Sequence, residues 1–147
     1  MLHLCPLSES LLISNSRSAC DTDLLCRERV TFCINVSKQQ PFPALKISGM
    51  RVPVFDEPAE NLYKYFDRCA DAIEDAGKQG GRTLVYCKNG RSRSAAICTA
   101  YFMKHRSLSL QEAFGDVVQW MLTDVQVSTH RLLKHAPEIS QASGRTQ

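Results

Sequence analysis

A cysteine and an arginine six residues apart are the residues of this sequence best suited to do chemistry. Cys87 follows the apolar run Leu84–Tyr86, and Arg93 closes the polar stretch after it, with Gly90 between them. A loop wound around the N-terminus of a helix points several backbone N–H groups at one spot and so forms an anion site. The same field favours the ionised, nucleophilic form of a thiol placed there. Since the fork of Arg93 can grip two oxygens of a tetrahedral anion, the pattern predicts a site for a phosphate ester.

The neighbouring elements are expected to hold this loop between a strand and a helix. Thr83–Tyr86 is a short apolar run typical of a strand, and the small and apolar residues of Ser94–His105 favour a buried helix. Before them, Asn61–Ala76 repeats its apolar residues at three- and four-residue steps. This spacing predicts an amphipathic helix, with Gly77 as its C-terminal stop.

The remaining elements follow from shorter signals. Ser18 is expected to cap a short helix that runs toward Glu28, and Ser109 and Glu112 have the spacing of a capping box that opens a last helix. Runs of apolar and β-branched residues predict further strands over Leu11–Ser14, Val30–Val36 and Met50–Val54. Strands that alternate with helices predict an α/β layered domain with a largely parallel sheet.

Composition limits the class of protein and its partners. The 147 residues suffice for one domain, expected over residues 1–136 and atypical from about 115, with a polar, flexible tail over 137–147. A net charge of +3 does not argue for nucleic acid, and no stretch approaches the roughly 20 apolar residues of a membrane span. We therefore expect neither nucleic acid nor a membrane as a partner, and oligomeric state is not indicated.

The seven cysteines are not those of a secreted disulfide framework. Their number is odd, no C-x-x-C pair occurs, and most lie inside apolar runs. The N-terminal residues carry no basic and apolar pattern of a secretory signal. We expect a reduced protein of the cytoplasm or nucleus, with Cys33 and Cys98 as inert core thiols rather than disulfide partners of Cys87.

The stretch CKNGRSRS resembles the phosphate-binding loop of cysteine-dependent protein phosphatases, C-x-x-G-x-x-R-S/T. With NSRSAC, VTFCINVS and GMRVPVFDEPAENL, it makes Leu11–Phe114 similar to the small atypical dual-specificity phosphatases. The resemblance implies a central, mostly parallel sheet of four to five strands flanked by helices, as in protein tyrosine phosphatases. It also implies hydrolysis of phosphotyrosine and phosphoserine or phosphothreonine in proteins, without a metal or another cofactor.

Carried over by position, the resemblance gives each site residue a role. Cys87 would be the nucleophile that becomes a cysteinyl-phosphate, Arg93 would hold the transferring phosphoryl group, and Ser94 would donate its hydroxyl to the sulfur. Asp56, in VPVFDEP, matches the residue that protonates the leaving group and then acts as a base toward water, with Glu57 as a second candidate. The substrate phosphate is expected to bind Lys88, Asn89, Gly90, Arg91, Ser92 and Arg93.

Two departures from the family pattern bear on activity. Tyr86 stands where the family usually has His, so we expect slow turnover, which Tyr86→His should raise. After Phe114 the family's Asn-containing loop is absent, and Arg131–His135 predicts only a weaker helical turn in place of the family's last, aromatic-bearing helix. Two hypotheses stay open: a phosphatase of low activity, or a pseudophosphatase that binds phosphorylated proteins without turnover. A low-molecular-weight phosphatase or an arsenate reductase fits poorly, because those enzymes carry the loop near the N-terminus.

Overall fold

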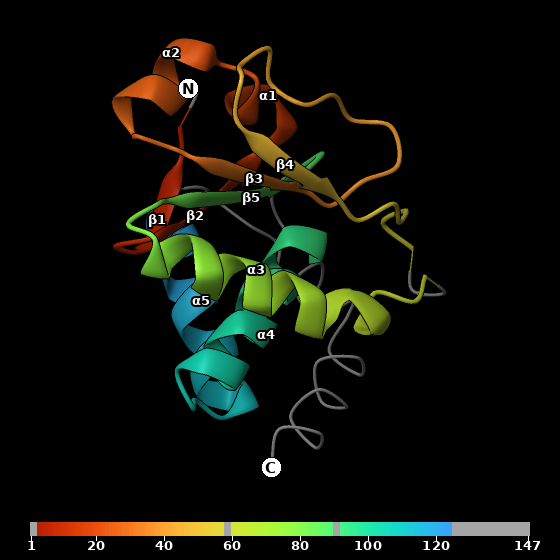
Figure 1. Ribbon diagram of the computed structural model, residues 1–147. Helices are drawn as coiled ribbons and strands as arrows, with labels where there is room; N and C mark the ends of the chain where they lie inside the picture. Colours follow the sequence, from red (N-terminus) through yellow and green to blue (C-terminus); the bar gives the residue numbers. More distant parts are fainter. Residues whose placement is uncertain (1–2, 58–59, 90–91, 125–147) are drawn as a thin grey trace.

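The computed structural model describes residues 3–57, 60–89 and 92–124, with the side chains of the last helix described through Gln119. The predicted tail over 137–147 and most of the atypical C-terminal segment lie outside the described residues. The elements are β1 (Cys5–Ser8), β2 (Leu11–Asn15), α1 (Ser16–Ala19), α2 (Thr22–Arg27), β3 (Phe32–Asn35), β4 (Ser48–Arg51), the 3-10 helix η1 (Tyr63–Tyr65), α3 (Phe66–Lys78), β5 (Thr83–Cys87), α4 (Ser92–His105) and α5 (Leu110–Asp124) (Figure 1).

The five strands form one mixed sheet in the order β1-β2-β5-β3-β4. β2, β3, β4 and β5 run parallel, and β1 pairs antiparallel with β2. The prediction of a mostly parallel sheet with flanking helices is therefore confirmed. At the carboxyl edge Cys87 pairs with Asn15 of β2, and Tyr86 pairs with Asn35 of β3. The segments that follow these strands meet at this edge, which is where ligands bind in open α/β sheets.

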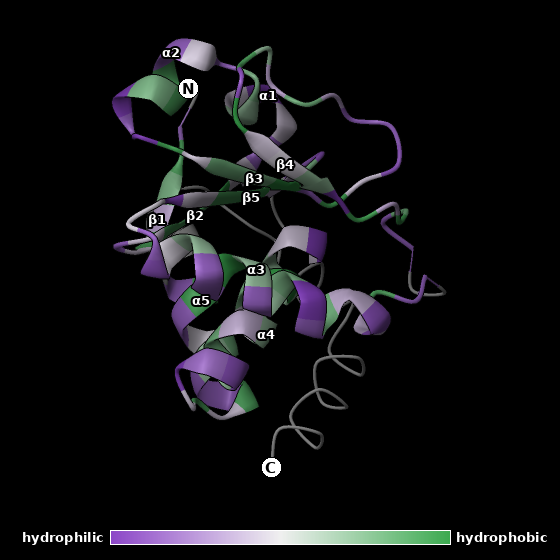
Figure 2. Cartoon of the chain, in the orientation of Figure 1, coloured by the Kyte–Doolittle hydropathy of each residue, from purple (hydrophilic) through white to green (hydrophobic). Residues whose placement is uncertain are grey.

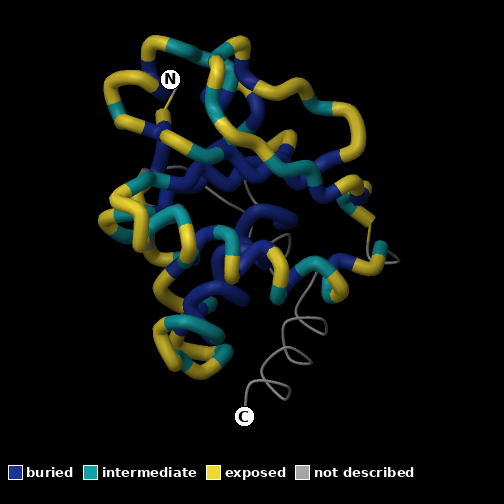
Figure 3. The backbone as a smooth tube through the Cα atoms, in the orientation of Figure 1, coloured by how far each residue is buried: buried dark blue, intermediate teal, exposed yellow. Residues whose placement is uncertain are grey.

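Helices cover both faces of the sheet, as Figure 1 shows: α1 and α2 lie on one side and α3, α4 and α5 on the other. Side chains alternate along β5, so that Val85 and Cys87 enter the core beneath α3–α5 while Leu84 and Tyr86 enter the core beneath α1 and α2. Figure 2 shows the apolar character of the central strands, and Figure 3 shows the burial of the sheet and of α4. The last two residues of β5, Tyr86 and Cys87, are thus packed into the two layers on either side of the sheet.

The region after β2 folds as two short helices rather than the single one predicted. α1 is capped by Asn15, whose side chain accepts from the Ser18 N–H at 2.8 Å. α2 is capped by Asp21, which accepts from the Leu24 N–H at 3.1 Å. The prediction that Ser18 is the cap was wrong, because the side chain of Asn15 caps α1 and the side chain of Asp21 caps α2. Ser18 lies inside α1 and accepts from the backbone of His3.

The end of α3 corrects a second prediction. The helix runs through Gly77 to Lys78, and the chain leaves it at Gly80, whose φ is +80°. The Gly81 N–H donates to the Ala76 carbonyl at 2.8 Å and the Gly80 N–H to the Gly77 carbonyl at 3.0 Å, a Schellman pattern. The stop is therefore the glycine that adopts a positive φ, not the first glycine in the sequence.

The start of α5 confirms the capping box. The Ser109 N–H donates to Glu112 Oε1 at 3.0 Å, and the Glu112 N–H donates to Ser109 Oγ at 3.1 Å. Ala113 and Val117 of this helix are buried against the core. Among the described residues, no helix combines the length and the apolar character needed to cross a membrane.

Candidate active site

Cys87 and Ser94 lie together where β5 gives way to α4. Cys87 ends the strand and is only 2% exposed, so a phosphate ester must enter the loop to reach its sulfur. Its Sγ lies 3.2 Å from the Oγ of Ser94, which is buried in the first turn of α4. A hydroxyl at this distance can donate a hydrogen bond to the sulfur.

The loop between them is held at its start and opens onto a helix N-terminus. The Lys88 carbonyl accepts from the Ser16 N–H at 3.3 Å, which ties the loop to α1. Lys88 and Asn89 are exposed, and Ser92 is buried with a hydroxyl that has no hydrogen-bond partner in the described part of the chain. The predicted phosphate-binding residues Gly90 and Arg91 lie outside the described residues. A buried hydroxyl without a hydrogen-bond partner among the described residues, such as that of Ser92, is suited to bind a ligand.

Arg93 connects the start of α4 to the segment that carries Asp56. Its side chain is buried, its Nη1 donates to the Val54 carbonyl at 3.0 Å, and its Nε lies 4.0 Å from Asp56 Oδ1. Within the described residues, Nε has no hydrogen-bond partner. The guanidinium is thus fixed by one nitrogen and retains donor capacity for an anion.

A cavity of about 250 Å³ brings together several of the predicted residues. It contains the carboxylates of Asp56 and Glu57 and the cations of Lys88 and Arg93. Its other lining residues are ones to which the sequence analysis assigned no role, and they come from two segments: Ser37, Lys38, Gln39, Gln40 and Phe55. These irregular segments follow the carboxyl ends of β3 and β4, and their contacts across the cavity leave no periodic signal in the sequence.

Residues 37–40, which line the cavity, and Pro41 after them form a wall that side chains fasten to the sheet. Asn35 Nδ2 donates to the Gln40 carbonyl at 2.8 Å. Arg51 donates through Nη1 to the Ser37 carbonyl at 3.0 Å and through Nη2 to the Gln40 carbonyl at 2.9 Å. These bonds fix the backbone of the wall on two neighbouring strands.

Tyr86 also fastens this wall. Its hydroxyl donates to the Pro41 carbonyl at 2.8 Å, and burial raises its pKa above the ordinary value, so that it stays a donor. Tyr86 and Cys87 point into opposite layers. The sequence predicted slow turnover from Tyr86, and in the structure its hydroxyl bonds to Pro41, which directly follows the lining residues 37–40.

Residues 11–130 match the family model described as "Dual specificity phosphatase, catalytic domain". The chain belongs to the dual specificity phosphatase family. Dual specificity phosphatase 28 of Mus musculus is 55% identical over 106 residues, which are 71% of this chain and 65% of that protein. The Homo sapiens protein is 54% identical over 106 residues, 71% of this chain and 60% of its own length. The match thus spans somewhat less than two thirds of these curated relatives.

Solved structures of dual specificity phosphatases share the fold. A variant of human dual specificity phosphatase 28 has a TM-score of 0.86 and 40% identity, covering 98% of each chain. A mouse putative dual specificity phosphatase complexed with zinc tungstate has a TM-score of 0.90 and 41% identity, covering 100% of this chain and 90% of that one. The predicted resemblance to the small atypical dual specificity phosphatases is confirmed, and dual specificity phosphatase 28 is among the similar proteins.

Proposed function

We propose that this dual specificity phosphatase hydrolyses phosphotyrosine and phosphoserine or phosphothreonine in proteins through a cysteinyl-phosphate, with low turnover. The observation that carries the proposal is the 3.2 Å contact between Cys87 Sγ and Ser94 Oγ at the junction of β5 and α4. That junction places a sulfur, a hydroxyl and the positive end of a helix at one point. Arg93, whose side chain is buried, lies in the same first turn of α4.

In the first step the Cys87 thiolate attacks phosphorus. The S–P bond forms, the P–O bond to the substrate breaks, and Asp56 gives its proton to the departing oxygen. Arg93 and the backbone N–H groups of the loop stabilise the charge on the equatorial oxygens. Side chains and amides supply all of these groups, so no metal takes part in the proposed steps.

In the second step water attacks the phosphorus of the cysteinyl-phosphate. The water gives a proton to the Asp56 carboxylate, the P–O bond to water forms, and the S–P bond breaks. The sulfur leaves as a thiolate, which accepts a hydrogen bond from the Ser94 hydroxyl. Inorganic phosphate is released, and the protonated Asp56 is ready for the next substrate.

Two further observations support the proposal. The similar mouse structure is described as a complex with zinc tungstate. Tungstate is a tetrahedral oxyanion, which is the shape that the loop of this chain would receive. In addition, all seven cysteines lie in the described part of the chain and each is a thiol. A nucleophilic thiol stays reduced in the cytoplasm or nucleus, where we place the protein.

The experiment that tests this proposal is a single-turnover reaction with an aryl phosphate, quenched in acid and examined by peptide mass spectrometry. We expect a phosphate on Cys87 and its loss, together with all phosphate release, in Cys87→Ser. Cys26→Ser is the matched control, because Cys26 is an exposed thiol on α2. Phosphate release that persists in Cys87→Ser would contradict the mechanism. Binding of a phosphopeptide without release by the unmodified chain would instead favour the pseudophosphatase.

A further inference from the structure

Lys38 reaches from the fastened wall of the cavity to the segment that carries Asp56. Its Nζ lies 4.1 Å from the centroid of the Phe55 ring and 3.9 Å from Oε1 of Glu60. Phe55 is 45% exposed, so the ammonium covers part of an aromatic ring that would otherwise face water. Lys38 thereby connects two irregular segments that no strand pairing joins.

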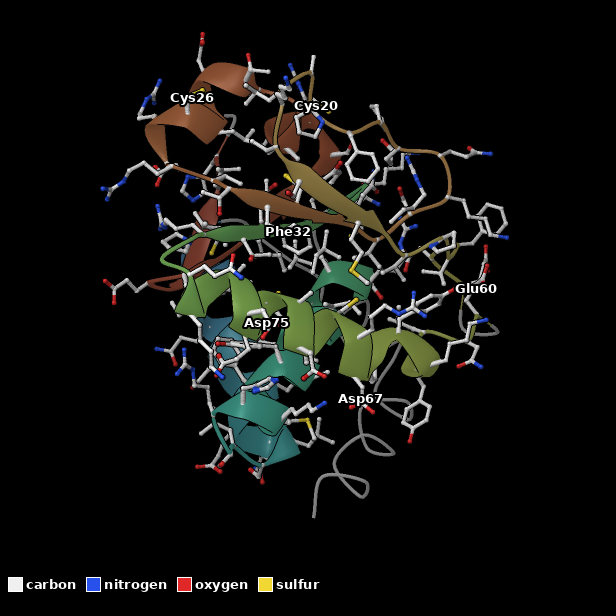
Figure 4. The ribbon with its side chains drawn as sticks, in the orientation of Figure 1. Cys20, Cys26, Phe32, Glu60, Asp67 and Asp75 are labelled. Atoms are coloured by element: carbon white, nitrogen blue, oxygen red, sulfur yellow. The ribbon has the colours of Figure 1, made fainter. Side chains whose placement is uncertain are left out.

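Glu60 makes two hydrogen bonds within the segment that carries Asp56. Its Oε1 accepts a hydrogen bond from the Phe55 N–H at 2.9 Å, and its own N–H donates to the Glu57 carbonyl at 3.1 Å. Figure 4 shows Glu60 at the side of the molecule where this segment lies. One carboxylate oxygen therefore meets both the backbone of the residue before Asp56 and the ammonium of Lys38.

These contacts lie directly beside the backbone of Asp56. Arg93 holds Val54 on one side of Phe55 and lies 4.0 Å from the Asp56 carboxylate. We propose that Lys38 and Glu60 are positioning residues for Asp56, which hold its segment against the fastened wall so that its carboxyl meets the leaving oxygen. The inference rests on the proposed role of Asp56 as the acid, and it adds two residues to which the family resemblance assigns no role.

The test is the dependence of kcat/KM on the leaving group, measured with aryl phosphates whose phenols differ in acidity. A misplaced acid slows poor leaving groups most, because good ones depart without a proton. We expect Lys38→Met and Glu60→Ala to lower kcat/KM about threefold to tenfold for the least acidic phenol and by less than about 1.5-fold for the most acidic. Lys38→Arg keeps a cation and should restore the original dependence.

The chain supplies matched controls for both variants. The Nζ of Lys64 lies 5.3 Å from the centroid of the Tyr65 ring, and Lys64 is not among the residues that line the cavity. Lys64→Met therefore removes a similar cation–ring contact and should leave the leaving-group dependence unchanged. Glu60→Gln keeps an oxygen that accepts from the Phe55 N–H but loses the charge facing Lys38, so its effect should be smaller than that of Glu60→Ala.

The variant Asp56→Asn distinguishes a failure of the positioning role of Lys38 and Glu60 from a failure of the acid role of Asp56. If Asp56→Asn steepens the dependence and neither Lys38→Met nor Glu60→Ala does, the positioning role is overturned while the acid stands. If Asp56→Asn leaves the dependence unchanged, the proposed role of Asp56 itself fails. In an Asp56→Asn background, Lys38→Met should add no further steepening, and an added effect would overturn the inference. Lys38→Arg and Glu60→Gln keep the test decisive should the harsher variants fail to fold.

Discussion

The hydroxyl of Tyr86 donates a hydrogen bond of 2.8 Å to the carbonyl of Pro41, which lies 45 residues earlier in the chain. The same carbonyl lies 3.4 Å from Asn35 Nδ2. The residue directly before the candidate nucleophile therefore fastens the wall from which Lys38 extends, at Pro41, directly after the lining residues 37–40. Through this bond, the residue type at position 86 is expected to affect residues 37–40, which line the cavity together with Asp56.

Removing the Tyr86 hydroxyl is expected to loosen this wall. Tyr86→Phe keeps the buried ring and loses one hydrogen bond, so we expect the free energy of unfolding to fall by about 1 kcal/mol. We expect kcat/KM for aryl phosphates to fall about threefold to tenfold, because the wall shifts relative to Asp56. Urea denaturation and steady-state kinetics measure the two effects.

Tyr101→Phe is the control for this prediction. Its hydroxyl donates to Glu74 Oε1 at 3.2 Å between α4 and α3, so the variant loses a comparable bond in another part of the molecule. It should lose a similar stability with no change in kcat/KM. Equal kinetic losses in both variants would mean that stability alone is responsible. Tyr86→His also removes the bond to Pro41, so the gain in turnover predicted from the sequence would have to arise at the phosphate loop.

Ser94→Ala is expected to slow the second chemical step. Without the hydroxyl 3.2 Å from the sulfur, the departing Cys87 thiolate loses a donor. We expect kcat to fall by about tenfold to a hundredfold and the cysteinyl-phosphate to accumulate as a burst in rapid-quench measurements. Thr99→Val is the control, because Thr99 is buried in the same helix and donates to the Ala95 carbonyl at 2.8 Å, away from the sulfur. A loss of kcat without accumulation would count against the assigned role.

The ion pairs between α3 and α4 predict a pH-dependent contribution to stability. Lys104 donates a hydrogen bond to Asp71 and chiefly for this reason lowers the pKa of that carboxyl, to which His105 also lies close. A carboxyl whose pKa is lowered on folding stabilises the native state above its unfolded pKa. It loses this contribution as the pH falls through the lower folded pKa.

Asp71→Asn checks this contribution. The Asp71 side chain is 53% exposed, so we expect the variant to be less stable at pH 7 by less than about 1 kcal/mol. The difference from the unmodified chain should vanish near pH 2, where both side chains are neutral. Asp75→Asn, at an exposed position of the same helix, is the control. A difference that is constant with pH would show that the effect is not electrostatic.

The core cysteines are expected to resist alkylation in the native state. Burial raises the pKa of Cys33 and of Cys69 to about 12 and raises that of Cys98 well above its ordinary value. Because the thiolate is the reactive form, iodoacetamide at pH 8 should label the exposed Cys26 and leave these three until the chain unfolds. Figure 4 shows Cys26 and Cys20 on the side of α1 and α2. Peptide mass spectrometry after mild oxidation should likewise find no bridge from Cys98 to Cys87.

Local patterns in the sequence predicted much of the fold and the chemical core of the site. The strand, loop and helix around Cys87 are consecutive in the chain, so hydrophobic runs and one glycine sufficed to place the loop. The capping box of Ser109 and Glu112 is likewise a short-range pattern with a defined geometry. Such features need no knowledge of distant residues.

What the sequence did not predict depends on contacts between distant or irregular segments. β1 carries a proline and alternates buried with more exposed residues over only four positions, which is too short a run to identify as a strand. The contacts of Lys38 with Phe55 and Glu60 join two segments of loop, and the bond from Tyr86 to Pro41 crosses from a strand to a loop. No periodicity marks such pairs, because each depends on where the sheet places its neighbours.

The amino ends of the parallel strands lie away from Cys87 and offer a place to attach a label or a tether. Gln79 is exposed in the turn between α3 and β5, and the five residues of β5 separate that turn from Cys87 by roughly 16 Å. A fluorophore or a surface tether joined at Gln79 would sit at the opposite end of the strand from the chemistry. An immobilised form of the molecule could thus display its cavity outward to solvent.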